Sequence, residues 1–168
     1  MPRFKVRLLL VLVTSLFVCV NAYGATVDSL QIIGSPNITE TDICTVSRIP
    51  DAVIDLFHAK GGHILFVSSP LEYRYGAFTP TVYGLYHESS HRIYIRNGSE
   101  VGYVLAHELG HFLFHETRPS WAADIRERFT DTEEFAEVYA TYCVYGTADA
   151  AINSIHMTVE KLSERGKL

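Results

Sequence analysis

The most constraining feature of this sequence is a pair of histidines four residues apart, with a glutamate directly after the first. They stand in the segment His107-Glu108-Leu109-Gly110-His111. The apolar pattern around this segment predicts a helix from Ser99 to Glu116 that packs into the interior. Residues four apart lie on one face of a helix, about one turn from each other. Because unpaired polar groups are costly to bury, this helix needs a partner for its two imidazoles, and a metal ion would be one.

The same spacing is typical of zinc sites on helices, where two imidazoles bind one ion. A zinc ion that hydrolyses a substrate needs a third protein ligand and an open position for water. His107 and His111 are therefore predicted ligands of one Zn²⁺, and Glu108 is predicted to take a proton from the water. The alternative is that both histidines are satisfied without a metal, since such a match arises by chance in about one chain of this length in a few hundred.

A third ligand is available in the next predicted helix, from Asp131 to Tyr145, which carries three glutamates near its start. Glu133 and Glu137 are four residues apart and share a face, whereas Glu134 points away from them. A solvated charge at the positive end of the helix dipole is the favoured interpretation of Glu134. Glu134 remains the alternative third ligand.

The stretch from Arg92 to Glu116 resembles the ImmA/IrrE metallopeptidases, and the likeness continues through Glu133 and the alanines after it. The segment from Glu133 to Glu137 also resembles the zinc domain of anthrax lethal factor and the secreted Pro-Pro endopeptidases. In such gluzincins the helix after the zinc-binding one supplies a ligand glutamate, followed four residues later by an acid that orients the first histidine. The resemblance therefore implies Glu133 as the third ligand, Glu137 as the orienting acid and a zincin-like fold.

One position departs from the lethal-factor-like pattern. Those enzymes place a tyrosine a few residues before the ligand glutamate to steady the oxyanion, and the corresponding residue here is Arg126. Arg126 itself, His91 and Tyr139 are candidates for that role, although a helical tyrosine at the spacing of Tyr139 is more often a core residue. The residue that stabilises the oxyanion is left unassigned.

The elements before and after the motif predict a small α+β domain with a short mixed sheet. Residues 70 to 81 lack periodicity and are predicted to form a loop whose tyrosines line a cleft. Strict alternation in Arg92 to Arg96 predicts a half-buried strand at a sheet edge, along which a peptide substrate would bind. The remaining predicted elements are a strand from Leu30 to Ile33, a helix opened by Pro50, a strand from His63 to Ser68, a hairpin of Thr81 to Tyr86 with Arg92 to Arg96, and a C-terminal helix from Ala148 to Glu164.

The N-terminus predicts export. A basic segment from Met1 to Arg7 is followed by an apolar run from Leu8 to Val20 and then by a stretch of small residues. This is the pattern of a signal peptide over residues 1–24, which we expect to be cleaved after Gly24. The run is shorter than the roughly 20 residues of a spanning helix, so we expect no stable membrane anchor. The expected location is extracellular or periplasmic, with residues 25–168 as one metallopeptidase domain.

Charge and cysteine content refine this expectation. Removing the three basic residues of the signal peptide from the 14 in the chain leaves 11 against 19 acidic residues, a net charge of about −8, which makes nucleic acid an unexpected partner. Two cysteines remain after cleavage, Cys44 and Cys143, and in an exported chain such a pair is more often a disulfide than two buried thiols.

Together these patterns predict a secreted zinc endopeptidase that hydrolyses a peptide or protein substrate. Two alternatives stay open: a secreted zinc-binding or interaction protein whose site does not turn over, suggested by the missing tyrosine, and a toxin-like protease with a single target. The sequence determines neither the cleavage specificity nor the oligomeric state.

Overall fold

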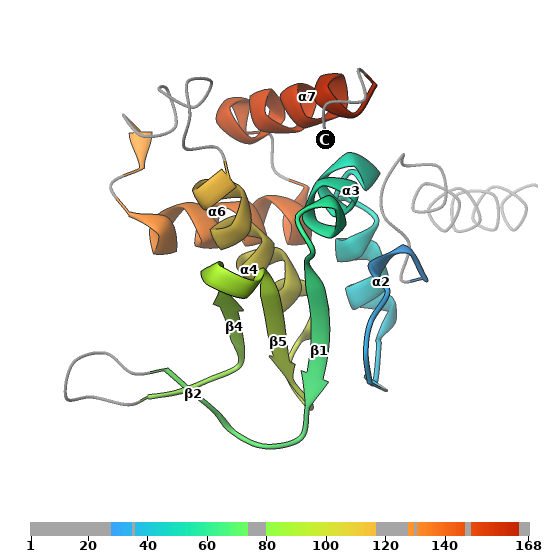
Figure 1. The fold of residues 1–168 in the computed structure, drawn as a ribbon, viewed down its shortest axis with the longest axis vertical. Helices are drawn as coiled ribbons and strands as arrows, with labels where there is room; N and C mark the ends of the chain where they lie inside the picture. The colour runs from blue at the N-terminus through green and yellow to red at the C-terminus, as the bar shows by residue number, and fades with distance from the viewer. Residues whose placement is uncertain are drawn as a thin grey trace, which may run out of the picture.

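The computed structural model describes residues 28–34, 36–73, 80–116, 128–129, 131–146 and 149–164. It confirms the predicted α+β class, with helices stacked over a small sheet (Figure 1). The predicted signal peptide and Arg126 lie outside the described residues. The helices are η1 (Asp28–Leu30), α2 (Glu40–Val46), α3 (Asp51–Ala59), η2 (Glu88–Ser90), α4 (Val101–Glu116), α6 (Thr132–Tyr145) and α7 (Ala150–Glu164).

The main sheet has three strands in the order β1-β5-β4. Strand β1 (His63–Val67) runs parallel to β5 (Arg92–Arg96), and β4 (Gly84–His87) runs antiparallel to β5. The predicted mixed sheet and the hairpin are thus confirmed. The region predicted as a loop differs from the expectation, because β2 (Leu71–Glu72) and β3 (Thr81–Val82) pair in a separate two-stranded sheet.

The prediction that Arg92–Arg96 lies at the edge of the sheet is wrong. This strand, β5, is the central one, and both of its edges are already paired. Ile93 and Ile95 are fully buried, as the alternation predicts, but alternation reports only the two faces of a strand and says nothing about its two edges. A peptide therefore cannot add to β5 by backbone pairing. The outer edges of this sheet belong to β1, which Ile33 meets through one isolated bridge, and to β4, which no other described strand covers.

The predicted strand from Leu30 to Ile33 is also wrong. Its first residue ends the short helix η1, and only Ile33 meets the sheet, through a single bridge to Leu65 of β1. Leu30 is buried in the core, so the apolar residues of this segment were correctly recognised as interior while their conformation was not. A run this short gives no periodicity that separates a strand from a helical turn.

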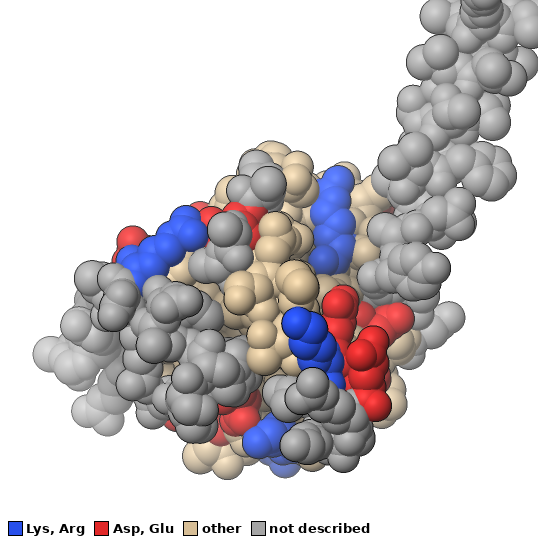
Figure 2. Space-filling view, turned by 90° about the horizontal axis from the view of Figure 1, so that it is seen from above, with Lys and Arg blue, Asp and Glu red and all other residues tan. Residues whose placement is uncertain are grey.

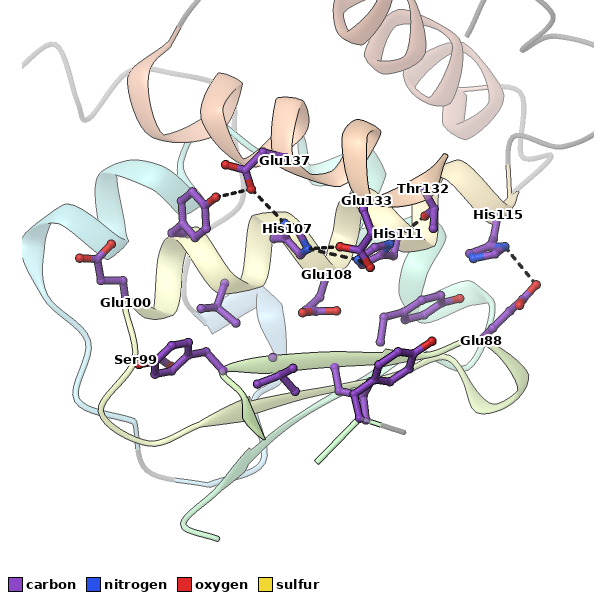
Figure 3. A pocket seen from close by; sticks show the side chains of 18 of the residues that line it. Glu88, Ser99, Glu100, His107, Glu108, His111, His115, Thr132, Glu133 and Glu137 are labelled. Atoms are coloured by element: carbon purple, nitrogen blue, oxygen red, sulfur yellow. Dashed lines mark hydrogen bonds and ion pairs between the residues drawn. The ribbon is translucent and has the colours of Figure 1, made fainter. Parts of the chain in front are cut away.

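Helix α4 occupies the centre of the molecule, between the sheet and α6. It packs against β4 and β5 on one side and against α6 on the other, while α2 crosses its beginning (Figures 1 and 3). Its apolar residues, including Leu105, Leu109 and Phe112, are fully buried in one hydrophobic core that also takes in α3 and α7. This burial explains why the helix is apolar on nearly all sides.

Helix α2 was not predicted, although its sequence contains a start signal. Thr39 and Asp42 form a capping box, in which the Thr39 side chain accepts a hydrogen bond from the Asp42 backbone and the Asp42 carboxylate accepts one from the Thr39 backbone. The second oxygen of Asp42 accepts a hydrogen bond of 2.6 Å from the backbone N–H of Gly102, in the first turn of α4. One buried carboxylate thus caps two helices and joins their ends.

The approach of α4 to α6 depends on Gly110. A Cβ atom at this position would lie 2.6 Å from the Cα atom of Ala136 and 3.1 Å from its Cβ atom. No larger residue fits there without a shift of the backbone, so the absence of a side chain sets the distance between the two helices.

The cysteines do not form the predicted disulfide. Cys143 is fully buried on α6, and it is not bonded to Cys44. Burial raises the pKa of the Cys143 thiol to about 12, which keeps it protonated and inert.

The outer surface carries charges of both signs. On the face seen in Figure 2, basic side chains lie beside acidic ones, and the described residues visible from that side form no continuous basic area. Within the described ranges, no helix is both long enough and apolar enough to span a membrane.

Replacing Gly110 by alanine tests the contact between the helices. In an exposed helix this substitution stabilises by up to about 1 kcal/mol, but here we expect a loss of about 1–3 kcal/mol because the added methyl group meets the Ala136 backbone. Urea unfolding of Gly110→Ala gives the change, with Ser154→Ala on the exposed face of α7 as the control. A stability equal to or above that of the unaltered protein would contradict the close packing.

Candidate metal centre

Three side chains from two helices converge on one point at the centre of the fold. His107 and His111 extend from α4, and Glu133 comes down from the first turn of α6 (Figure 3). The two imidazole Nε2 atoms lie 3.2 Å apart, and the Glu133 carboxylate oxygens lie 3.4 Å from His107 Nε2 and 3.5 Å from His111 Nε2. The structure therefore brings together the three residues predicted as ligands.

These distances are short enough for one metal ion to contact all three side chains. With zinc–ligand bonds of about 2.0–2.1 Å, two ligand atoms of a tetrahedral site are separated by about 3.3–3.4 Å. The two Nε2 atoms are 3.2 Å apart, and Glu133 approaches them with different oxygens, Oε2 at 3.4 Å from His107 and Oε1 at 3.5 Å from His111. The Glu133 side chain is 73% exposed while those of His107 and His111 are 19% and 12% exposed, so the ligand group is open on the side of Glu133.

The other ring nitrogens explain why the Nε2 atoms meet. His111 Nδ1 lies 2.7 Å from Thr132 Oγ1, and His107 Nδ1 lies 3.6 Å from Glu137 Oε2. His107 Nδ1 is buried and has no hydrogen-bond partner among the described residues. An imidazole whose Nδ1 carries the proton presents the bare lone pair of Nε2 on the opposite side. With that tautomer in both rings, two lone pairs and a carboxylate converge, which is unfavourable unless a cation lies between them. The donor set therefore fits a divalent metal ion better than a network of hydrogen bonds.

The titration of His111 agrees with a ligand role. Burial, with smaller contributions from the neighbouring His107 and His115, lowers the pKa of His111 to about 4. The ring is therefore neutral at physiological pH, which is the state in which an imidazole binds metal.

Glu108 extends from α4 toward the sheet (Figure 3). It is only 5% exposed, and its carboxylate accepts a hydrogen bond from the backbone of Tyr86 in β4. Burial raises the pKa of Glu108 to about 8; the bond from Tyr86 opposes this rise and the nearby Glu133 adds to it. Glu108 is thus a buried carboxylate held beside the three ligands, at the position that a base acting on a water molecule requires.

Gly84 makes room for this carboxylate. A Cβ atom on Gly84 would lie 2.4 Å from Glu108 Oε1 and 2.5 Å from a methyl carbon of Val104. The strand β4 can therefore approach α4 only because residue 84 has no side chain.

An open cleft of about 780 Å³ runs over the ligands and Glu108. One wall is formed by residues 82–86, at and beside the free edge of β4, and the other by α4 and the start of α6. Four tyrosines line the cleft: Tyr73, Tyr83, Tyr86 and Tyr103. Tyr73 belongs to the segment predicted as a loop, and the other three lie outside it.

The remaining predicted residues lie elsewhere. Glu134 is outside the ligand group, and its backbone N–H donates to the N-cap Asp131 at 2.8 Å. Tyr139 is fully buried with its hydroxyl 3.1 Å from His156 Nε2, so it does not face the cleft. His91 Nδ1 lies 2.8 Å from the Tyr86 hydroxyl, and His91 is not among the described residues that line the cleft. The structure therefore supports none of the described oxyanion candidates.

Two cleft residues escaped sequence reasoning. The Tyr103 hydroxyl donates a hydrogen bond of 2.5 Å to Glu137 Oε2, and its ring stacks on that of His107. Thr132 faces His111. Tyr103 precedes His107 by four residues, so helical spacing would have been enough to predict that it lies on the ligand face. Nothing in the sequence distinguishes Thr132 from an ordinary helix-start residue.

Comparisons with models of known protein families, with curated protein sequences and with solved structures gave no match.

Glu133 and Glu134 offer a matched pair for testing the ligand set. We expect Glu133→Gln to weaken zinc binding by more than about 100-fold, because losing a ligand exceeds the roughly 10- to 100-fold cost of losing an outer partner. Glu134→Gln should bind zinc as the unaltered protein does. Competition with a chromophoric chelator, starting from metal-free protein, measures both affinities. Equal affinities for the two variants would remove Glu133 from the site.

Proposed function

We propose that this protein is a zinc-dependent endopeptidase, with His107, His111 and Glu133 as the metal ligands and Glu108 as the general base. The convergence of the two Nε2 atoms and the Glu133 carboxylate, at separations of 3.2 to 3.5 Å, carries this proposal. A pure storage or structural site needs no buried carboxylate beside its ligands and no cleft above them, and this protein has both. The resemblance to gluzincins points to the same chemistry.

The residues divide the reaction between them. His107, His111 and Glu133 would hold a zinc ion, which would supply Lewis acidity for a water molecule and for the carbonyl of the substrate. Glu108 takes the proton of the attacking water and delivers it to the nitrogen of the peptide bond that breaks, which yields a new carboxyl group and a new amine. The Tyr86 backbone N–H holds the Glu108 carboxylate at one oxygen and so fixes its direction.

The free edge of β4 is suited to bind the substrate. The backbone N–H of Arg96 donates to the carbonyl of Tyr83, so alternation along the ladder directs the backbone groups of Gly84 and Tyr86 away from β5. The Tyr86 N–H is occupied by Glu108, which leaves the Tyr86 carbonyl and both backbone groups of Gly84 for a substrate. An extended peptide could add there as a further strand, with its backbone beside Glu108. We therefore propose that the substrate binds along β4, and not along β5 as expected from the sequence.

The charge of the cleft indicates which peptides it favours. Five glutamates line it and no lysine or arginine is among the described lining residues: Glu88, Glu100, Glu108, Glu133 and Glu137. Even with a divalent ion at the ligands, negative charge exceeds positive charge. We therefore propose that the substrates are peptides with basic side chains near the bond that is cut.

The alternative function is a secreted zinc-binding protein that does not turn over. The lack of an assigned oxyanion residue favours it, whereas the position of Glu108 favours an enzyme. A protease with one dominant target would have the same site, and only its substrates would differ.

Glu108→Gln separates the enzyme from the zinc-binding protein. The amide has the same shape but cannot take a proton, so we expect the cleavage rate of a mixed peptide library to fall by about 10²- to 10⁴-fold. Zinc content should stay at one ion per chain, measured by elemental analysis. If the unaltered protein holds zinc but its peptide products equal those of Glu108→Gln, the enzyme proposal fails.

The charge preference is tested with peptides that differ at one position beside the cut. We expect kcat/KM to be higher for lysine or arginine than for glutamate, and Glu100→Gln to reduce that preference about two- to fivefold. Glu40→Gln, at the start of α2 and outside the cleft, is the control. The preference should also shrink as salt is raised. A preference for acidic peptides would overturn the assignment.

A further inference from the structure

The residues behind the two imidazoles differ in kind. Behind His107 is the Glu137 carboxylate, at 3.6 Å from Nδ1, and behind His111 is the Thr132 hydroxyl, at 2.7 Å. Both partners come from α6, the helix that also supplies Glu133 (Figure 3). A carboxylate and a hydroxyl give very different support, because the carboxylate strengthens the ligand through its charge and the hydroxyl orients it without adding charge.

Glu137 makes no hydrogen bond to His107, whose Nδ1 is buried without a hydrogen-bond partner at 3.6 Å from Glu137 Oε2. Its side chain is 60% exposed, so in isolation it would move between rotamers in water. The Tyr103 hydroxyl donates to Oε2, the oxygen that faces His107 Nδ1, at 2.5 Å. The Tyr103 ring also stacks on the His107 ring, with centroids 6.4 Å apart and planes 23° apart. Tyr103 therefore restrains the carboxylate and the imidazole together.

Thr132 is available for His111 because another residue caps the helix. Asp131 is the N-cap of α6 and accepts the backbone N–H of Glu134. A threonine at the start of a helix ordinarily uses its hydroxyl for that purpose. Here the Thr132 hydroxyl is directed to His111 Nδ1, a nitrogen in a side chain that is only 12% exposed. An unpaired N–H at that depth would be costly, so the contact fixes which nitrogen of His111 faces the ligand centre.

We propose that Tyr103 and Thr132 are positioning residues that set how tightly the centre holds its metal, Tyr103 through Glu137 and His107, and Thr132 through His111. This inference rests on the proposed metal centre and assigns it two separate supports. Because the supports act on different histidines, their effects should be independent of each other. Within one support, the effect of Tyr103 should require Glu137.

A double-mutant cycle on zinc affinity tests this inference. We expect Tyr103→Phe and Thr132→Val each to weaken zinc binding by about 10-fold, within the range for outer partners of ligand histidines. In the Glu137→Ala background, Tyr103→Phe should have no further effect, whereas Thr132→Val should still cost about 10-fold. Thr132→Ser, which keeps the hydroxyl, should restore the affinity. All affinities are measured by chelator competition on metal-free protein.

The controls separate positioning from folding. Tyr142→Phe removes a phenol on α6 that donates to Asn153, away from the metal centre, and should leave zinc affinity unchanged. The melting temperature of each metal-free variant should match that of the unaltered protein, and the absorption bands of bound Co²⁺ should shift in Tyr103→Phe and Thr132→Val but not in Tyr142→Phe.

The outcomes distinguish this inference from the proposed function. If the unaltered protein binds no zinc, the metal centre itself is wrong. If it binds zinc and the Tyr103 and Thr132 variants bind equally well, only the inference is overturned. A Tyr103→Phe effect that persists without Glu137, or a Thr132→Ser variant as weak as Thr132→Val, would also overturn it.

Discussion

The close approach of α4 and α6 is the constraint on which the rest of this structure depends. It is set at one point, where Gly110 of α4 meets the backbone of Ala136 on α6. His107 and His111 lie three residues before and one after Gly110, and Glu133 and Glu137 stand in the same relation to Ala136. Because helical geometry repeats this spacing on both sides of the contact, fixing one point brings all four side chains face to face.

The sheet side of α4 has its own close contact, and the two together explain how a helix this apolar carries a polar centre. Gly84 lets β4 lie against Glu108, and the Tyr86 backbone provides the hydrogen bond that a buried carboxylate needs. The polar side chains of the motif thus leave α4 toward two neighbours. Both imidazoles meet α6 and the Glu108 carboxylate meets β4, so the space between α6 and β4 becomes the cleft.

Helix α6 contributes more to the centre than one ligand. It supplies Glu133, the Glu137 carboxylate behind His107 and the Thr132 hydroxyl behind His111. The unequal charge of the two supports gives the histidines different character, although their positions in the motif are equivalent. Beyond α6, the Asp42 carboxylate holds the start of α4 against α2.

The sequence by itself determined the class of fold, the existence and the end of α4, and the shared face of His107 and His111. These follow from local periodicity, since a spacing of four residues fixes a shared helical face whatever surrounds the helix. The choice of Glu133 as the third side chain came from the resemblance to gluzincins. Tertiary structure alone decided that β5 is central and β4 is at the edge, because pairing such as His63 with Arg92 joins residues far apart in the chain. It also decided that Cys44 and Cys143 are not bonded to each other, and that Thr132 and Tyr103 stand behind the ligands. Those outcomes depend on which surfaces meet, and spacing along a single chain does not encode that directly.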